Sequence, residues 1–209
     1  MSVSQPRSAP RAPAVTLADL LPGRATTRIV RDLLLVAGGA LLTGLAAQVA
    51  FRVPWTEVPY TLQTGAVLLV GTALGSWRGG ASMLTYVLAG AIGLPAFAGG
   101  RSGLEGTGGG VTPTLGYLVG FIVAAVVVGW LAERRWDRSP VSAAGLMVLG
   151  NLVIYAIGVP VLAIVLGLPL LTAVWEGAVV FVPWDLAKVA LAAGILPLAW
   201  RLAGDRRRD

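Results

Sequence analysis

The stretch LLLVAGGALLTGLAAQVAF, Leu33 to Phe51, decides the class of fold, because it runs for 19 residues without a charged side chain. About 20 apolar residues in a helix cross the ~30 Å hydrocarbon core of a bilayer. The whole chain agrees: 56% of its 209 residues are hydrophobic and 12% are charged, whereas about 25% are charged in an ordinary soluble domain. The sequence therefore predicts an integral membrane protein.

Other uncharged stretches predict further spans and an all-α fold, a bundle of six transmembrane helices. We expect the helix within Val58 to Trp77 to start near Tyr60, because Pro59 favours a helix start. The 37 uncharged residues from Ser139 to Trp175 would overshoot a bilayer as one helix, so we expect breaks at Gly158-Val159-Pro160 and Gly167-Leu168-Pro169. The remaining spans are Gly79 to Leu94, Thr114 to Ala132, about Ala143 to Val159 and about Trp184 to Arg201.

Pro95 to Pro113 contains seven glycines in nineteen residues and predicts an outer loop between the third and fourth helices. Gly103 and Gly108 match the glycines of a Walker A motif, but Gly109 stands where its lysine must be, so the phosphate-binding motif is absent. The loop is interpreted either as a lid over a site or as a disordered connector.

The distribution of arginines predicts the orientation. With six spans, the termini and two internal turns share one side, which carries thirteen arginines, whereas Arg52 and Arg101 lie on the other. By the positive-inside rule both termini are cytoplasmic, in the cell membrane, and the glycine-rich loop faces outward. Because the basic residues are spread over tails and turns, no nucleic-acid partner is expected. We divide the chain into a disordered tail (1–28), a membrane domain (29–204) and a short basic tail (205–209).

One cation lies inside a span, and it has an acid beside it. In Val182-Pro183-Trp184-Asp185-Leu186-Ala187-Lys188, the two charged residues are three positions apart and share one helix face. Charges inside a membrane are costly and usually functional. The pair is either a structural ion pair or part of a site for a polar molecule.

Other polar and aromatic residues are candidates to line such a site in the outer half of the bundle: Gln63, Tyr86, Phe97, Arg101 and Tyr117. Asn151 and Tyr155 share a face of the fifth span, where interhelical hydrogen bonding is the common role and ligand contact the less common one. The absence of cysteine and histidine excludes thiol and imidazole chemistry, and neither a metal nor a cofactor is expected.

Ala40 and Gly44, like Gly39 and Thr43, are small residues four apart in the first span, a spacing that lets another helix approach closely. They fit either docking of a partner subunit or packing inside the subunit. Three functions stay open from these residues: a solute-capturing transport subunit, an intramembrane enzyme using Asp185, and a stand-alone proton-coupled carrier.

Several segments together resemble the BioY family: Val58-Pro59-Tyr60-Thr61-Leu62-Gln63-Thr64, Gly90-Ala91-Ile92-Gly93-Leu94-Pro95-Ala96-Phe97-Ala98-Gly99-Gly100, Gly116-Tyr117-Leu118-Val119-Gly120-Phe121 and the Pro183 to Lys188 motif. The resemblance runs in order from about Arg31 to Ala203. BioY proteins are biotin-specific substrate-binding subunits of energy-coupling-factor transporters. The resemblance implies that this chain binds biotin from outside, while a transmembrane coupling subunit and two ATP-hydrolysing subunits supply the energy.

The resemblance also implies roles for single residues. Asp185 and Lys188 would bind the ureido ring, whose N–H groups and carbonyl suit a carboxylate and an ammonium. Phe97, Tyr86 and Trp184 are the expected apolar walls. We hypothesise that Arg101, on the loop, receives the biotin carboxylate. Ala40 and Gly44 are the expected docking surface for the coupling subunit.

Overall fold

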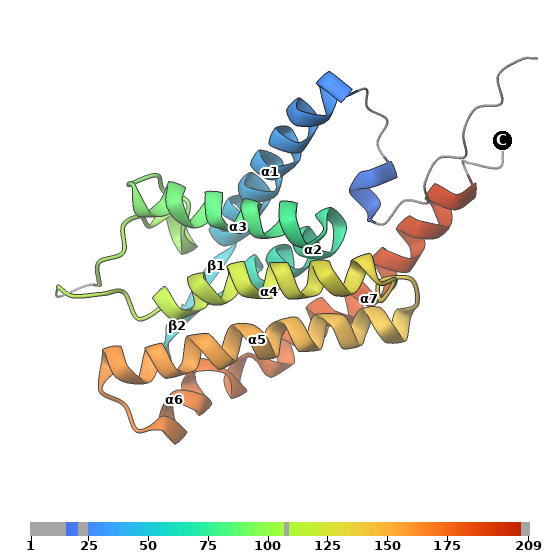
Figure 1. The fold of residues 1–209 in the computed structure, drawn as a ribbon. Helices are drawn as coiled ribbons and strands as arrows, with labels where there is room; N and C mark the ends of the chain where they lie inside the picture. The colour runs from blue at the N-terminus through green and yellow to red at the C-terminus, as the bar shows by residue number, and fades with distance from the viewer. Residues whose placement is uncertain (1–15, 21–24, 107–108, 206–209) are drawn as a thin grey trace, which may run out of the picture.

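The structure, a computed structural model, describes residues 16–20, 25–106 and 109–205 (Figure 1). Most of the predicted disordered tail and residues 206–209 lie outside these ranges. The described part of the tail differs from the expectation: it contains a short 3-10 helix, η1 (Leu17–Leu20), and α1 begins at Ala25. Arg78 forms a salt bridge with Asp19 of η1, so this segment is attached to the membrane domain.

The chain is a mostly helical membrane protein. Its helices are α1 (Ala25–Gln48), α2 (Gln63–Leu74), α3 (Ser76–Ala91), α4 (Leu115–Glu133), α5 (Pro140–Leu166), α6 (Leu170–Gly177) and α7 (Val182–Asp205), with the short helices η2 (Ala98–Gly100) and η3 (Val179–Phe181). Among the described residues, four helical stretches are long and apolar enough to cross a membrane: Thr27–Gln48, Leu115–Glu133, Pro140–Leu166 and Leu170–Ala203.

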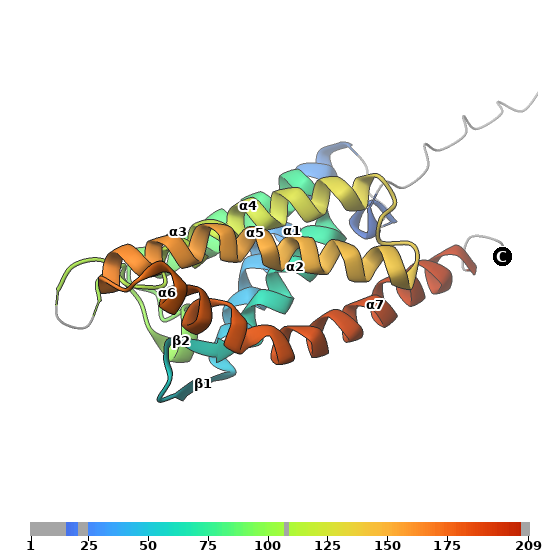
Figure 2. The same ribbon diagram turned by 90° about the horizontal axis from the view of Figure 1, so that it is seen from below.

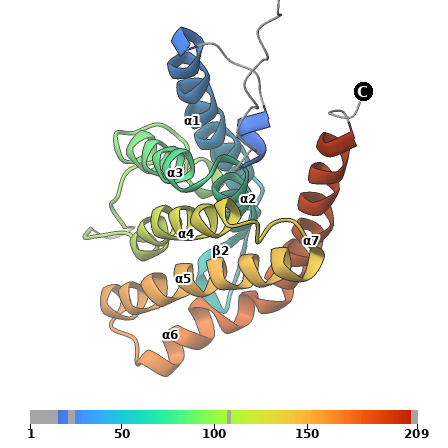
Figure 3. The ribbon, with the colours of Figure 1, turned by 45° about the vertical axis from the view of Figure 1, so that its right-hand side comes forward.

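The helix α4 lies at the centre of the bundle, where it packs against α2, α3 and α5. In Figure 3, α1 and α7 stand on opposite sides of this group. Figure 2 shows that α6, the strands and the loop before α4 gather toward one end of the molecule, while α7 runs to the other. The termini of the described chain and the turns after α2 and α4 therefore lie away from the loop-rich end.

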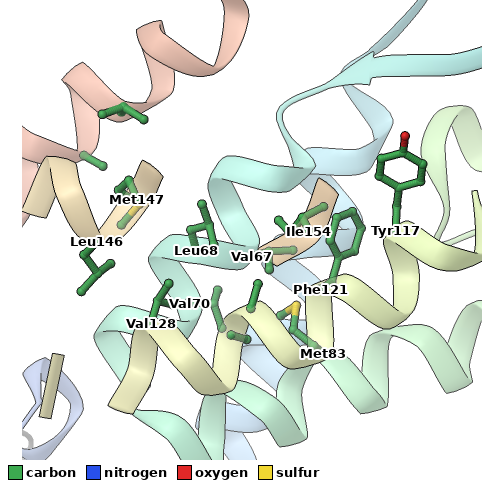
Figure 4. Packing of buried hydrophobic residues seen from close by; sticks show 14 of the residues in the cluster. Val67, Leu68, Val70, Met83, Tyr117, Phe121, Val128, Leu146, Met147 and Ile154 are labelled. Atoms are coloured by element: carbon green, nitrogen blue, oxygen red, sulfur yellow. The ribbon is translucent and has the colours of Figure 1, made fainter. Parts of the chain in front are cut away.

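Glycines allow the central helices to pack closely. A Cβ atom at Gly71 would lie 2.7 Å from the Ala125 carbonyl oxygen, and one at Gly79 would lie 2.7 Å from the Gly71 Cα. Small residues at such crossings let helix backbones approach in membranes. Figure 4 shows the larger side chains that fill the remaining space, among them Leu68, Met83, Phe121, Val128 and Ile154.

The prediction of an all-α fold is wrong around the second span. Residues Ala50–Val53 and Thr56–Thr61 form an antiparallel hairpin, β1 and β2, and α2 begins at Gln63 rather than near Tyr60. The ring of Phe51 stacks on that of Tyr60 across the hairpin, with centroids 5.1 Å apart. Cross-strand aromatic pairs of this kind stabilise hairpins. The hairpin contacts α6 and η2, so it caps the loop-rich end.

The predicted break at Gly158-Val159-Pro160 is also wrong. The helix α5 continues through Pro160 and ends at Leu166, and the capping residue Gly167 adopts a left-handed conformation with φ 64°. A Cβ atom at Gly158 would lie 2.6 Å from Cδ1 of the Tyr117 ring, so close packing explains why a glycine stands at this position. Interior prolines are tolerated in membrane helices because neighbouring groups satisfy the freed carbonyl. The second break is confirmed, and the short helix α6, which we did not predict, follows it.

Candidate ligand-binding site

A cavity at the loop-rich end brings together residues that are far apart in the sequence. Its walls come from β2, α2, the glycine-rich loop, α4, α5, η3 and α7. Six of the predicted site residues line it: Gln63, Phe97, Arg101, Tyr117, Asp185 and Lys188. Tyr86, Asn151 and Trp184 lie outside the lining.

Asp185 and Lys188 form a buried ion pair in this cavity. Lys188 Nζ lies 2.9 Å from Asp185 Oδ1, and the side chains are 12% and 8% exposed, respectively. Asp185 lies in the first turn of α7, as predicted, where the helix dipole favours a negative charge. The aliphatic part of Lys188 packs over Gly65, at which a Cβ atom would lie 3.3 Å from Lys188 Cδ.

Two side chains from other helices complete this pair. The Tyr155 hydroxyl of α5 donates a short hydrogen bond to Asp185 Oδ2. Thr64 Oγ1 of α2 accepts a hydrogen bond of 2.6 Å from Lys188 Nζ. Both residues line the cavity, and neither was among the predicted site residues. The signal for Tyr155 was its position one turn after Asn151 in an apolar span.

Gln63, Tyr86 and Phe97 form a second group beside the ion pair. Gln63 Nε2 donates a hydrogen bond of 2.7 Å to the Tyr86 hydroxyl. The Tyr86 ring meets the Phe97 ring edge to face, with centroids 5.6 Å apart. Tyr86 is fully buried behind the cavity, so it supports Gln63 and Phe97 rather than forming a wall itself.

The described part of the glycine-rich loop is folded over the cavity. Phe97 N donates to the Arg101 carbonyl (2.9 Å), and Gly103 N donates to the Gly90 carbonyl (2.8 Å), which ties the loop to the end of α3. Gly99 and Gly100 both have positive φ in the tight turn between Phe97 and Arg101, a conformation that glycine adopts without strain. These contacts favour the lid over the disordered connector.

Arg101 is the cation of this loop, and it forms no salt bridge with any described residue. Burial lowers the pKa of its guanidinium, neighbouring Arg52 lowers it further, and Glu57 raises it. Arginine stays charged in proteins despite such shifts. The cavity therefore has an unpaired positive group in its lid and an ion pair on α7.

Tyr117 and Trp184 join the elements around the cavity by donating hydrogen bonds to backbone carbonyls. The Tyr117 hydroxyl donates to the Gly177 carbonyl (2.8 Å), joining α4 to α6. The Trp184 indole N–H donates to the Thr61 carbonyl (3.0 Å), joining α7 to β2. Trp184 therefore lies behind the cavity and does not form the apolar wall that we expected.

Asn151 lies in a separate apolar cavity of about 240 Å³ between α1, α2, α5 and α7. It is buried, and its Oδ1 atom has no hydrogen-bond partner among the described residues. Lys188 lines both cavities, and its stem separates them. Asn151 and Tyr155 share a helix face, but the structure brings only Tyr155 to the ion pair.

The small residues of α1 mostly pack inside the subunit. A Cβ atom at Gly39 would lie 2.6 Å from Ser82 Oγ, and Thr43 is fully buried. Ala40 and Gly44 line a shallow hollow with residues of α3 and the start of the loop, including Tyr86 and Ala96. Packing inside the subunit is thus the simpler explanation of their size, and docking of a partner there stays a prediction.

The cavity suits a small molecule with a polar head and an anionic end. The carboxylate of Asp185 accepts hydrogen bonds, the ammonium of Lys188 donates them, and the guanidinium in the lid can bind an anion. Apolar side chains such as Phe97, Leu118, Phe121 and Phe181 line the space between. Among the described residues, no group of three or more acidic, cysteine or histidine side chains could hold a metal ion.

Comparison with known proteins gives consistent matches. The model of the BioY family matches residues 15–205. The chain is 36% identical over 174 residues to "Biotin transporter BioY" of Rhizobium etli, covering 78% of this chain and 89% of that protein. It is 38% identical over 159 residues to "Biotin transporter BioY" of Thermotoga maritima, covering 76% and 90%.

Among solved structures, the fold resembles the crystal structure of "the S-component for biotin from an ECF-type ABC transporter". The TM-score is 0.75, and the match covers 86% of this chain and 95% of that one. At 21% sequence identity this likeness shows a shared fold.

Proposed function

The chain belongs to the BioY family, and from this premise we propose that it is the biotin-binding membrane subunit of an uptake transporter. It captures biotin from outside the cell and delivers it with energy from partner subunits. The role is transport, with no chemical change in the solute.

The observation that carries this proposal is the buried pair of Asp185 and Lys188 beneath the lid. A cyclic urea presents N–H donors on each side of a carbonyl acceptor. A carboxylate and an ammonium held 2.9 Å apart offer the complementary acceptor and donor. Gln63, whose amide nitrogen is engaged by Tyr86, adds a carboxamide to the same cavity.

The remaining residues of the cavity match the apolar ring, the chain and the carboxylate of biotin. We infer that its apolar ring and chain contact Phe97 and the aromatic wall of α4 and η3, and that Arg101 binds its carboxylate. An unpaired guanidinium in the lid is available for such an ion pair. Closing the lid over the ligand would then add this contact to those at the ion pair.

We propose a six-span path in which α2 and α3 cross as short helices. The 12 residues of α2 cover about 18 Å as a helix, so the hairpin and the adjoining turns complete the crossing. Both termini then lie in the cytoplasm and the lid faces outward, in agreement with the arginine distribution. In this path the membrane domain, predicted as residues 29–204, begins with α1 at Ala25 and ends with α7 at Asp205, between two cytoplasmic tails.

Membership of the BioY family implies that the energy comes from a transmembrane coupling subunit and two ATP-hydrolysing subunits, and the missing Walker A lysine in this sequence agrees with that. The surface formed by Ala40 and Gly44 on α1 is the proposed docking site. If it is, Ala40→Leu weakens co-purification of the coupling subunit and leaves biotin binding intact.

Uptake of radiolabelled biotin by cells that lack their own biotin transporter tests this function. We expect uptake when the chain is produced with its three energising subunits, and loss of uptake when both ATPases carry inactivated ATP sites. Uptake by the chain alone that collapses with the proton gradient would instead support a stand-alone proton-coupled carrier. No uptake under any of these conditions would contradict a transport role for biotin.

A further inference from the structure

The ion pair on α7 depends on two other helices for its geometry. Asp185 Oδ2 accepts the hydrogen bond from Tyr155 of α5, and Asp185 Oδ1 accepts from Lys188 Nζ (2.9 Å). Lys188 Nζ also donates to Thr64 Oγ1 of α2 (2.6 Å). Thr64 Oγ1 also donates a long hydrogen bond of 3.5 Å to Asp185 Oδ1, so Thr64 bridges the two charged groups, while Tyr155 holds Oδ2.

We propose that Tyr155 and Thr64 are positioning residues that set the ligand specificity of this site by fixing the orientation of the Asp185 carboxylate and the Lys188 ammonium within their ion pair. The inference rests on the proposed function, because it concerns how the same site selects a cyclic urea. It adds a role for two residues on α5 and α2, outside the α7 motif.

The physical reason lies in what the pair would do without these partners. Without these partners the carboxylate can rotate until both of its oxygens face the ammonium, and the acceptor and donor positions that faced the cavity then face the pair itself. The hydroxyl of Tyr155 holds Oδ2 away from Lys188, and Thr64 takes one ammonium proton. Because a carboxylate has about four lone-pair sites and an ammonium has three protons, Asp185 can still accept a hydrogen bond from a ligand N–H, and the third proton of Lys188 can bind a ligand carbonyl.

This arrangement discriminates a urea from a guanidine. In 2-iminobiotin the urea carbonyl is replaced by a nitrogen that carries protons, and the resulting guanidinium is positively charged at pH 7. An ammonium aimed at the carbonyl position stabilises biotin and repels the analogue. If the carboxylate rotated so that both oxygens faced the ammonium, biotin would lose its contacts with both groups, whereas the analogue would be relieved of the repulsion.

Equilibrium binding of biotin and 2-iminobiotin at pH 7 to the purified full chain tests the proposal. The variants are Tyr155→Phe and Thr64→Val. Their controls are Tyr60→Phe, whose hydroxyl bonds to the Val180 carbonyl, and Thr72→Val, whose hydroxyl bonds to the Leu68 carbonyl within α2. Each control removes a hydroxyl whose hydrogen bond goes to a backbone carbonyl and not to Asp185 or Lys188.

We expect Tyr155→Phe and Thr64→Val to weaken biotin binding about tenfold or more, the usual effect of losing a hydrogen bond to a charged group, and to reduce the preference for biotin over 2-iminobiotin. The controls should leave this preference unchanged. Equal losses for both ligands, or no loss, would overturn the proposal. Wild-type protein that binds neither ligand would instead contradict the proposed function.

Discussion

Replacing Gly90 with alanine should loosen the lid through a single methyl group. Gly90 is in the last turn of α3, beneath the lid residue Phe97. A Cβ atom there would lie 2.2 Å from both Cε1 and Cζ of the Phe97 ring and 2.7 Å from Cε2. Ordinary contact begins at 3.4 Å, so the ring must retreat by about 1 Å.

The ring has little room for this movement. The Phe97 side chain is 7% exposed and meets the Tyr86 ring edge to face. The lid backbone is also tied to α3 by the hydrogen bond from Gly103 N to the Gly90 carbonyl. Overpacking of this kind costs about 1–3 kcal/mol. If that energy is lost from the closed lid, biotin dissociates on the order of 5- to 150-fold faster.

The assay is release of prebound radiolabelled biotin into excess unlabelled biotin. The matched control is Gly38→Ala on α1, where a Cβ atom would meet nothing within 4 Å. We expect faster release from Gly90→Ala and wild-type release from Gly38→Ala, with both proteins folded as judged by thermal unfolding. Release from folded Gly90→Ala at the wild-type rate would refute the idea that Phe97 holds the lid closed.

Three further predictions concern the helix core, the charge cluster around Arg78 and the lid cation. In Gly129→Ala the new Cβ would lie 2.4 Å from backbone atoms of Gly75 and Ser76, which cannot move aside as a side chain can. We therefore expect thermal unfolding to show a loss of folding stability near the upper end of about 1–3 kcal/mol. The control Gly145→Ala, whose Cβ would meet nothing within 4 Å, should show no loss. Arg78 lies 3.0 Å from Asp19 and 3.1 Å from Asp32, and because these groups are partly exposed we expect Arg78→Met to cost about 1 kcal/mol. Burial raises the pKa of Asp19, but hydrogen bonds from Arg78 and Thr16 outweigh this effect and leave the pKa below its ordinary value. The stability gained from this carboxylate is therefore present at neutral pH and is lost as the pH falls through the lowered pKa. A difference in stability between wild type and Arg78→Met that persisted in acid would contradict this. Arg101→Ala should weaken binding of biotin about tenfold, as expected for the loss of a charged hydrogen bond, while affinity for biotin methyl ester stays the same; unchanged biotin affinity would show that Arg101 does not bind the carboxylate.

The positions of several spans could be predicted because charged residues mark the ends of spans. The fourth span, predicted as Thr114 to Ala132, agrees with α4 within one residue at each end. The hairpin was missed because Val58 to Thr61 belongs to a long uncharged stretch, and such a stretch is compatible with either an apolar helix or a buried strand. Pairing with residues 50–53 decides between them, and local sequence does not reveal that pairing.

The part of the candidate site that could be predicted consists of residues that are charged or polar inside an apolar span. Asp185 and Lys188 stood out because they were charged, and the structure brings them together. Trp184 is in the same motif, but the rotation of α7 directs its indole to the Thr61 carbonyl behind the cavity. From its spacing alone, Tyr155 could form an interhelical hydrogen bond or contact a ligand. The packing of α5 against α7 brings it to Asp185.

The most direct measurement is saturation binding of radiolabelled biotin to the purified, detergent-solubilised chain, with Asp185→Asn and Lys188→Ala beside it. The proposed function predicts one saturable site per chain in wild type and a loss of affinity of about tenfold or more in each variant, because each removes a buried charged partner. Wild-type protein without saturable binding, or variants that bind biotin as tightly as wild type, would contradict a biotin site built on this ion pair.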